Sequence, residues 1–458
     1  MNATQSILND LQTYTETLVA EQNIPAASIA VWKDGQLHQA AAGILNLNTG
    51  VTATPDAIFQ IGSITKVMTT CLVMQLVDEG RIALDTPVKH YLRDFLVADP
   101  EATARITVRQ LLNHTSGMAG DYFPDDRGHQ GNLIARYVDR CNLLPQVHPL
   151  GEQYSYSNSA FVVAGRLVEV MRGISWYQAM QDYIFTPLGM HHALADPADV
   201  IRHRAAMGHI RDEGADTWSL SNQPWLALGM APCGSTPMMS AADLLIFARA
   251  HLDKGLNSQG ERWLSAEAVA AMQTPEIALP QLSQCFSRQA GLGWAMHSYA
   301  EKGIRAMGHG GATKGFYAMT KLLPEHNAAF AILLNGVCPA TLRSANDALL
   351  HALCGIEIQE PEIDKPSSLS PVHKAIAGHY ESFDKIIRVR EEGGQLQAHL
   401  IYKIDPLPAE DLILYPVTDR CYAAENTQGV RQPNWAFEGE GTAPDYLFDG
   451  SRLNPRVA

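Results

Sequence analysis

The chain carries the stretch Gly62-Ser63-Ile64-Thr65-Lys66 at the start of a long apolar segment that ends near Gly80. Apolar side chains recur along this segment at helical spacing, so it predicts a buried helix with Ser63 at its N-terminus. The free backbone N–H groups and the dipole at that end of a helix favour a developing negative charge. The position therefore suits a serine that attacks a carbonyl group.

Lys66 lies one helical turn after Ser63 on the same face. A serine hydroxyl is a weak nucleophile that needs a nearby base, and an apolar surrounding lowers the pKa of a lysine amine so that it can accept the proton. An S-x-x-K pattern also occurs by chance, as an N-cap serine followed by a lysine whose amine reaches solvent. This motif is therefore a hypothesis that needs further residues.

A second segment supplies a phenol and an amide: Tyr154-Ser155-Tyr156-Ser157-Asn158. The Tyr156 phenol beside a lysine can act as a base or relay protons, and the Asn158 amide can hold a substrate carbonyl or orient the lysine. Taken alone, the segment is better described as a turn with a packed tyrosine, followed by a helix over 159–170 that Asn158 caps.

A third segment, Gly308-His309-Gly310-Gly311-Ala312, comes just before a strand predicted to begin near Gly315. Glycines at this point allow a substrate to approach the backbone closely. The N–H of Ala312 would then pair with the N–H of Ser63 as an oxyanion hole. The alternative is a glycine-rich loop with an incidental histidine.

Composition excludes several classes of function. The 458 residues carry a formal net charge of −14, which disfavours nucleic acid as a partner. No apolar run is long enough to span a bilayer. No H-E-x-x-H pattern, P-loop or dinucleotide-binding glycine motif is present, so we expect no metal and no cofactor. G-x-S-x-G is also absent, which leaves an α/β-hydrolase without support.

Localisation and redox state are predicted from the N-terminus and the cysteines. The N-terminal residues lack a basic region followed by an apolar stretch, so the sequence predicts no secretory signal. The 7 cysteines are unpatterned and odd in number, which indicates free thiols in a reducing compartment. We therefore expect a cytoplasmic protein.

The order of predicted elements indicates an α/β fold completed from both ends of the sequence. A helix over 3–22 and two strands over 26–32 and 37–42 come first, with Asp34-Gly35 as a hairpin turn between the strands. Residues 85–290 are rich in helices and loops. Strands over 315–323 and 328–334 and a helix over 339–353 follow, so we expect one sheet with a helical insertion.

A polar, proline-rich stretch over 357–371 is the best linker candidate. Short alternating segments beyond it predict strands over 386–390, 396–402 and 412–415. We therefore expect a main domain over 1–356, a linker over 357–371 and a small all-β domain over 372–458.

Taken together, the three motifs resemble the serine beta-lactamase-like superfamily, in its branch of class C beta-lactamases, D,D-carboxypeptidases, D-aminopeptidases and esterases. The family order of S-x-x-K, Y-x-N and [KH]-x-G is matched by Ser63 to Lys66, Tyr156 to Asn158 and His309 to Gly311. Residues 111–118, 187–190 and 240–244 are also similar to the family, and the resemblance covers about residues 5–355. The C-terminal part looks like the lipocalin-like domain that some members carry.

The resemblance implies an antiparallel sheet flanked by helices, a helical subdomain, and an active site between them. Ser63 is implied as the acylated nucleophile, and Lys66 and Tyr156 as the groups that handle its proton, with the choice of base left open. Asn158, His309, Gly311 and Ala312 are implied as the oxyanion-hole and substrate-binding residues. The stretch over 111–118 is expected to be a structural loop.

One departure from the family pattern bears on the substrate. Gly310 stands where beta-lactamases and penicillin-binding proteins commonly have Thr or Ser, whose hydroxyl helps to hold the substrate carboxylate. The resemblance therefore favours a peptidase, amidase or esterase acting on a small molecule or short peptide through an acyl-enzyme. The alternatives are class C-type beta-lactamase or penicillin-binding activity, and a catalytically silent relative that binds acyl ligands. The sequence does not indicate an oligomeric state.

Overall fold

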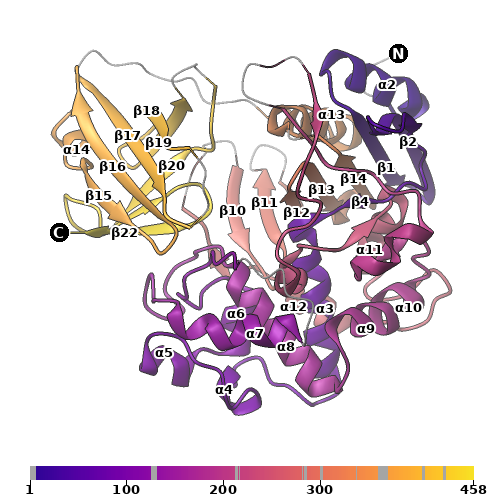
Figure 1. The fold of residues 1–458 in the computed structure, drawn as a ribbon, viewed down its shortest axis with the longest axis horizontal. Coiled ribbons are helices and arrows are strands. Elements are labelled where there is room, and N and C mark those ends of the chain that lie inside the picture. Colours follow the sequence, from indigo (N-terminus) through magenta and orange to yellow (C-terminus); the bar gives the residue numbers. More distant parts are fainter. Residues whose placement is uncertain are drawn as a thin grey trace.

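The computed structural model describes residues 7–124, 132–211, 215, 217–280, 282, 286–299, 303–336, 338–358, 370–404, 408–426 and 430–457. They form an antiparallel sheet covered by helices, a helical region below the sheet, and a closed barrel beside both (Figure 1). This is the arrangement that the family resemblance predicted.

The sheet is built from both ends of the first 350 or so residues, as the order of elements predicted. Strand β1 pairs with β14, so that Ile29 lies opposite Ile332. All seven residues of β14 are buried, which is typical of a central strand covered on both faces. The strand order is β3 (Val51–Thr52), β2 (Gln36–Asn46), β1 (Ala26–Lys33), β14 (Ala328–Leu334), β13 (Phe316–Leu323), β12 (Ile304–Thr313), β11 (Ala295–Tyr299), β10 (Phe286–Ala290) and β9 (Ile277–Ala278).

The hairpin between β1 and β2 turns at Asp34 and Gly35, as predicted. Their φ angles are 50° and 84°, and two positive values in succession are what a two-residue hairpin turn requires. Residues 3–6 of the predicted N-terminal helix lie outside the described residues, and residues 7–9 are helical but separated from the next helix by a turn at Asp10. Helix α2 covers Leu11–Glu21 because the Asp10 carboxylate accepts a hydrogen bond from the N–H of Thr13 and so caps the helix.

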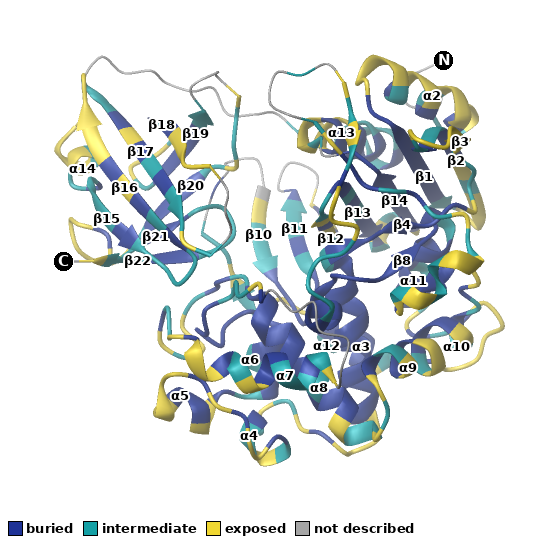
Figure 2. Cartoon of the chain, in the orientation of Figure 1, coloured by how far each residue is buried: buried dark blue, intermediate teal, exposed yellow. Residues whose placement is uncertain are grey.

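Helices cover both faces of the sheet. Helices α2 and α13 (Pro339–Cys354) pack through Leu18 and Leu349 on one face, in one hydrophobic cluster. The other face carries α11 (Ala241–Leu252), and the hydrophobic cluster on this face continues through α3 (Thr65–Asp78) to α8 (Asn158–Arg172) in the helical region. Figure 2 shows that α3 is buried along most of its length, and polar side chains on it such as Lys66 and Thr70 are hydrogen-bonded within the protein.

The other helices lie mainly around the helical region. They are α4 (Val88–Tyr91), α5 (Pro100–Arg105), α6 (Val108–Leu112), α7 (Leu133–Asp139), α9 (Trp176–Met180), α10 (Thr186–Leu188), α12 (Ala266–Met272) and α14 (Pro371–Lys374), with short turns of other helix types at η1 (Gly62–Ile64), η2 (Arg140–Leu143), η3 (Gln181–Phe185), η4 (Pro197–Arg202), η5 (Leu228–Cys233) and η6 (Pro324–His326). Small sheets join β4 (Phe59–Gln60), β8 (Met238–Met239) and β5 (Ala193–Leu194), and β6 (His209–Ile210) with β7 (Ser219–Leu220).

The C-terminal part is a closed barrel of eight antiparallel strands. Its first and last strands pair through Tyr380 and Arg456 and so close the barrel. Buried apolar side chains such as Leu396, Tyr422 and Phe437 form its core. The strands are β15 (Gly378–Glu381), β16 (Lys385–Glu392), β17 (Gln395–Tyr402), β18 (Glu410–Pro416), β19 (Cys421–Asn426), β20 (Trp435–Glu438), β21 (Tyr446–Phe448) and β22 (Leu453–Val457).

Some predictions fall partly outside the described residues. Most of the linker predicted over 357–371 lies there, so the proposed division of the chain stays a prediction. Cys285 also lies there, and the six described cysteines are free thiols. Among the helices of the described residues, none has the length and apolar character needed to cross a bilayer.

Candidate active site

Ser63 lies in the short turn η1 immediately before α3, as the sequence predicted. Close backbone packing around it depends on glycines. A Cβ on Gly311 would lie 1.9 Å from the carbonyl oxygen of Ile61 and 3.1 Å from the backbone nitrogen of Ser63. A Cβ on Gly234 would lie 2.2 Å from the carbonyl oxygen of Gly62. The backbone around Ser63 is therefore held between two segments that are distant in sequence.

Lys66 is fully buried and directs its amine at Ser63. Its Nζ lies 2.9 Å from Ser63 Oγ, 2.7 Å from Asn158 Oδ1 and 2.8 Å from the carbonyl oxygen of Cys233. Burial lowers the pKa of Lys66 to about 8, against the raising effect of Cys233 and Asp121. The amine is thus close to Ser63 and easier to deprotonate than an exposed lysine.

Tyr156 stands over the same amine. The centroid of its ring lies 4.8 Å from Lys66 Nζ, and the ring stacks on His114 at a centroid distance of 4.5 Å. Burial raises the pKa of Tyr156 well above its ordinary value, although a hydrogen bond with Ser63 opposes this. The phenol is therefore neutral near pH 7 and is placed to pass a proton rather than to begin as a phenolate.

Asn158 is the first residue of α8 and not its cap, which corrects the alternative drawn from the sequence. Ser157 caps the helix, because its Oγ accepts the N–H of Ala160 at 3.0 Å. The amide of Asn158 is thereby left for the site. Its Oδ1 accepts from Lys66, and its Nδ2 donates to Asp121 Oδ1 at 2.7 Å.

The third motif lies inside strand β12, where the sequence suggested a segment just before a strand. The strand begins at Ile304, and His309 lies on it with its ring centroid 6.1 Å from that of Tyr156. Burial and the charge of Lys66 lower the pKa of His309 to about 4, so the imidazole is neutral at pH 7. A Cβ on Gly62 would lie 2.6 Å from the backbone nitrogen of Ala312, so β12 runs directly against the turn that holds Ser63.

All seven residues named from the sequence thus gather in one place, while several contributors were missed. The Cys233 carbonyl has no sequence signal, because any residue can supply a backbone oxygen. His114 lies in the stretch expected to be a structural loop, where its Nδ1 accepts the N–H of Ser157 at 3.0 Å and its ring stacks on Tyr156. Asp121 and Arg452, which pair with a Nε–Oδ2 distance of 2.7 Å, were also missed because they lie far apart in sequence.

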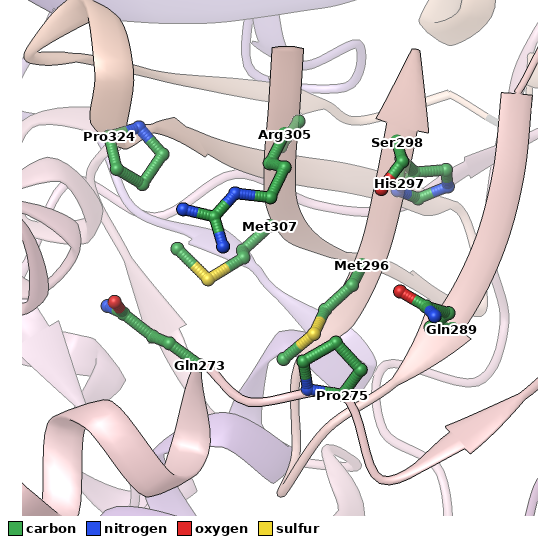
Figure 3. A pocket seen from close by; sticks show the side chains of 10 residues that line it. Gln273, Pro275, Gln289, Met296, His297, Ser298, Arg305, Met307 and Pro324 are labelled. Atoms are coloured by element: carbon green, nitrogen blue, oxygen red, sulfur yellow. The ribbon is translucent and has the colours of Figure 1, made fainter. Parts of the chain in front are cut away.

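A separate pocket opens on the sheet beside the end of α12. Met296, Met307 and Arg305 line it together with Gln273 and His297, and Figure 3 shows their side chains around the opening. None of its lining residues belongs to the site around Ser63. Among the described residues, no group of three or more His, Cys, Asp or Glu side chains is arranged to hold a metal ion.

Comparison with known proteins adds independent evidence. A family model described as Beta-lactamase matches residues 11–353. Penicillin-binding protein 4 of Amycolatopsis lactamdurans is 37% identical over 371 residues, which cover 80% of this chain and 95% of that protein.

Solved structures agree with the family match. The structure of SurE superposes with a TM-score of 0.79 at 27% identity and covers 99% of both chains. A second structure of SurE, described as the protein with D-Leu, gives a TM-score of 0.77 at 26% identity and covers 99% of this chain and 100% of that one. A class C beta-lactamase from Rhodobacter sphaeroides gives 0.61 at 21% identity, covers 77% of this chain and 100% of that one, and is alike in fold.

Proposed function

Because the chain belongs to the beta-lactamase family, we propose that it is a serine hydrolase that forms an acyl-enzyme at Ser63. Its substrate is a small molecule or short peptide with an amide, peptide or ester bond. The observation that carries this proposal is the distance of 2.9 Å between the buried Lys66 Nζ and Ser63 Oγ.

Lys66 in its neutral form is the general base. A neutral amine has two N–H donors and one lone pair. Asn158 Oδ1 and the Cys233 carbonyl oxygen accept hydrogen bonds only, so they take up the two N–H groups. The lone pair is then directed at the Ser63 hydroxyl and takes its proton as Oγ attacks the carbonyl carbon of the substrate.

The attack leaves a negative charge on the substrate oxygen, and the backbone N–H groups of Ser63 and Ala312 bind it in the proposal. Fixed donors of this kind typically contribute roughly 3–4 kcal/mol each to lowering the barrier. Tyr156 passes the proton from Lys66 to the leaving group as the carbonyl–heteroatom bond breaks. A water molecule then attacks the acyl-enzyme and gives a proton to the same pair of residues. The pair returns that proton to Ser63 Oγ as the bond between Oγ and the acyl carbon breaks and the acid leaves.

Binding of β-lactams is a second candidate, supported by the relative that is named a penicillin-binding protein. Gly310, the middle residue of the third motif, argues against efficient β-lactam hydrolysis, because it offers no hydroxyl to the substrate carboxylate. A peptidase, amidase or esterase is therefore the favoured reading. The SurE structure with D-Leu makes D-aminoacyl substrates the first to test.

Labelling with a fluorophosphonate probe tests the nucleophile. The intact protein should gain the mass of one probe, and Ser63→Ala should gain none and should lose turnover of p-nitrophenyl butyrate. Ser258→Ala, on an exposed turn, is the control and should behave as wild type. A chain that takes no label, and whose turnover does not depend on Ser63, would be the silent relative instead.

The substrate class needs a panel of compounds. D- and L-aminoacyl p-nitroanilides, short peptides, p-nitrophenyl esters and nitrocefin should be compared on wild type and Ser63→Ala. We expect Ser63-dependent turnover of esters or aminoacyl amides that exceeds the rate with nitrocefin. A nitrocefin rate at or above the ester rate would favour the second candidate.

A further inference from the structure

The barrel reaches the candidate site through the loop between β21 and β22. The backbone N–H of Tyr156 donates to the carbonyl oxygen of Ser451 at 3.0 Å, and the N–H of Leu453 donates to Ser155 Oγ at 3.2 Å. Arg288 of β10, the strand that faces the barrel in Figure 1, donates to the carbonyl oxygen of Gly450 at 3.4 Å. The loop is therefore bonded directly to the segment that carries Tyr156 and Asn158.

The loop has its own internal support. Asp449 Oδ1 accepts the N–H of Arg452 at 2.8 Å and that of Ser451 at 3.2 Å. Asp449 Oδ2 lies 2.6 Å from Nζ of Lys385 in β16, and both side chains are at most 10% exposed. The position of Arg452 is therefore supported from within the barrel, through Asp449 and Lys385, as well as from the Tyr156 segment.

Arg452 enters the site as the partner of Asp121. Its Nη2 donates to Asp121 Oδ1 at 2.9 Å, its Nε lies 2.7 Å from Oδ2, and the two side chains are 19% and 12% exposed. Asp121 Oδ1 also accepts from Asn158 Nδ2, whose Oδ1 accepts from Lys66. A continuous chain of polar contacts thus runs from the barrel to the amine of Lys66.

This chain determines which way the Asn158 amide points. An amide has a donor end and an acceptor end, and Asp121 accepts only, so the NH₂ group must face it. The oxygen must then face Lys66. Arg452 in turn balances the charge of Asp121, which would otherwise be an uncompensated, largely buried anion near the amine.

We propose that Arg452 of the barrel and Asp121 of the helical region act together as positioning residues for Asn158 and Lys66, which makes the barrel a working part of the catalytic unit. The inference rests on the proposed function, because it concerns the base that activates Ser63. The core of the barrel is filled by its own side chains, which fits a positioning role better than that of a ligand carrier.

The two members of the pair act on the base with opposite sign. The positive charge of Arg452 lowers the pKa of Lys66 and the negative charge of Asp121 raises it, both after the larger effect of burial. Removal of Arg452 should therefore move the acid limb of the pH–rate profile to higher pH, and removal of the Asp121 charge should move it to lower pH. The other titratable groups that face Lys66 or Tyr156 stay in place in these variants: Cys233, His114, His309 and Tyr154.

The experiment compares Arg452→Met, Asp121→Asn, their double variant and Arg452→Lys in the full chain, with p-nitrophenyl butyrate as substrate. We expect each single variant to lose about tenfold to a hundredfold in kcat, with a smaller change in KM, because the base is misplaced by a fraction of an ångström. The limbs should shift in opposite directions, and the double variant should return toward the wild-type limb. Arg452→Lys keeps the charge and should keep the limb in place.

Lys403→Met is the matched control, because Lys403 pairs with Glu381 on the surface of the same barrel at 3.0 Å. It should leave kcat and the pH profile unchanged. If Arg452→Met melts at a much lower temperature than wild type, the inference is judged from Arg452→Lys and Asp121→Asn, by the position of the acid limb in their pH–rate profiles. The inference would be overturned if the Arg452 and Asp121 variants keep the wild-type kcat and acid limb, or if their acid limbs shift in the same direction. This holds even if Ser63→Ala is inactive. Activity that survives in Ser63→Ala would instead overturn the proposed function.

Discussion

The amine nitrogen of Lys66 lies 2.9 Å from the hydroxyl oxygen of Ser63, one helical turn away, and its hydrogen-bond acceptors among the described residues include no carboxylate. A lysine held by neutral acceptors loses less on deprotonation than one held by a carboxylate. The contact therefore favours transfer of a proton from Ser63 to Lys66.

The first prediction is the pH dependence of activity. Burial lowers the pKa of Lys66 to about 8, so the amine is mostly protonated at pH 7 and has no lone pair for Ser63. The kcat/KM for p-nitrophenyl butyrate should therefore fall as the pH drops through about 8, after subtraction of the rate with Ser63→Ala. A flat profile from pH 5 to pH 9 would contradict Lys66 as the base.

The second prediction compares two neighbouring glycines of β12. A Cβ on Gly311 would lie 1.9 Å from the Ile61 carbonyl oxygen, whereas a Cβ on Gly310 would meet only the Ala318 carbonyl oxygen at 3.8 Å. Gly311→Ala should thus push the strand away from Ser63 and cost about a hundredfold in kcat. Gly310→Ala should keep activity within a few-fold, and equal losses in the two variants would count against this geometry.

Much of the site could be predicted because its residues follow one another at short spacing. Ser63 and Lys66 lie a helical turn apart, and Tyr156 and Asn158 lie on either side of the cap of one helix. Short sequence motifs were therefore enough to predict these four residues. The strands predicted over 386–390, 396–402 and 412–415 are confirmed within β16, β17 and β18, because alternation of buried and exposed side chains is also local.

What the sequence did not reveal depends on contacts between distant segments. Asp121 and Arg452 are 331 residues apart. In the sequence each looks like an ordinary charged surface residue, because the two meet only in the folded chain. The third motif was placed before a strand because its glycines suggest a loop. The structure places it inside β12, where a glycine is needed for the strand to pass close to Ile61.

The third prediction concerns His114, which has a φ angle of 63° and supports Tyr156. His114→Ala should leave the Ser157 N–H without its acceptor and place alanine in a left-handed conformation. We expect a loss of about 2 kcal/mol in the free energy of unfolding and a lower kcat. Asparagine tolerates this conformation and offers a side-chain acceptor, so His114→Asn should be more stable than His114→Ala. Equal denaturation midpoints for the two would contradict the assignment.

The fourth prediction is loss of stability in acid through the pair that anchors the barrel loop. Burial raises the pKa of Asp449, but Lys385 and Arg452 outweigh it and hold the value at about 2, below the ordinary 3.8. A carboxylate with a lowered pKa in the folded state stabilises above its unfolded pKa, and this contribution is lost as the pH falls from about 4 to about 2. The contribution is on the order of 2 kcal/mol.

Urea denaturation of wild type and Asp449→Asn at several pH values measures this contribution. At pH 6 the variant should be less stable by about 2–3 kcal/mol, because it also leaves the buried Lys385 with only the more distant carboxylate of Asp384, at 3.6 Å. The difference should shrink as the wild-type carboxylate takes up a proton toward pH 2. Glu381→Gln, in the exposed pair with Lys403, should show little difference at any pH, because exposed ion pairs contribute about 0–1 kcal/mol. A wild-type advantage that is the same at pH 2.5 and pH 6 would mean that Asp449 acts through the shape of the loop and not through its charge.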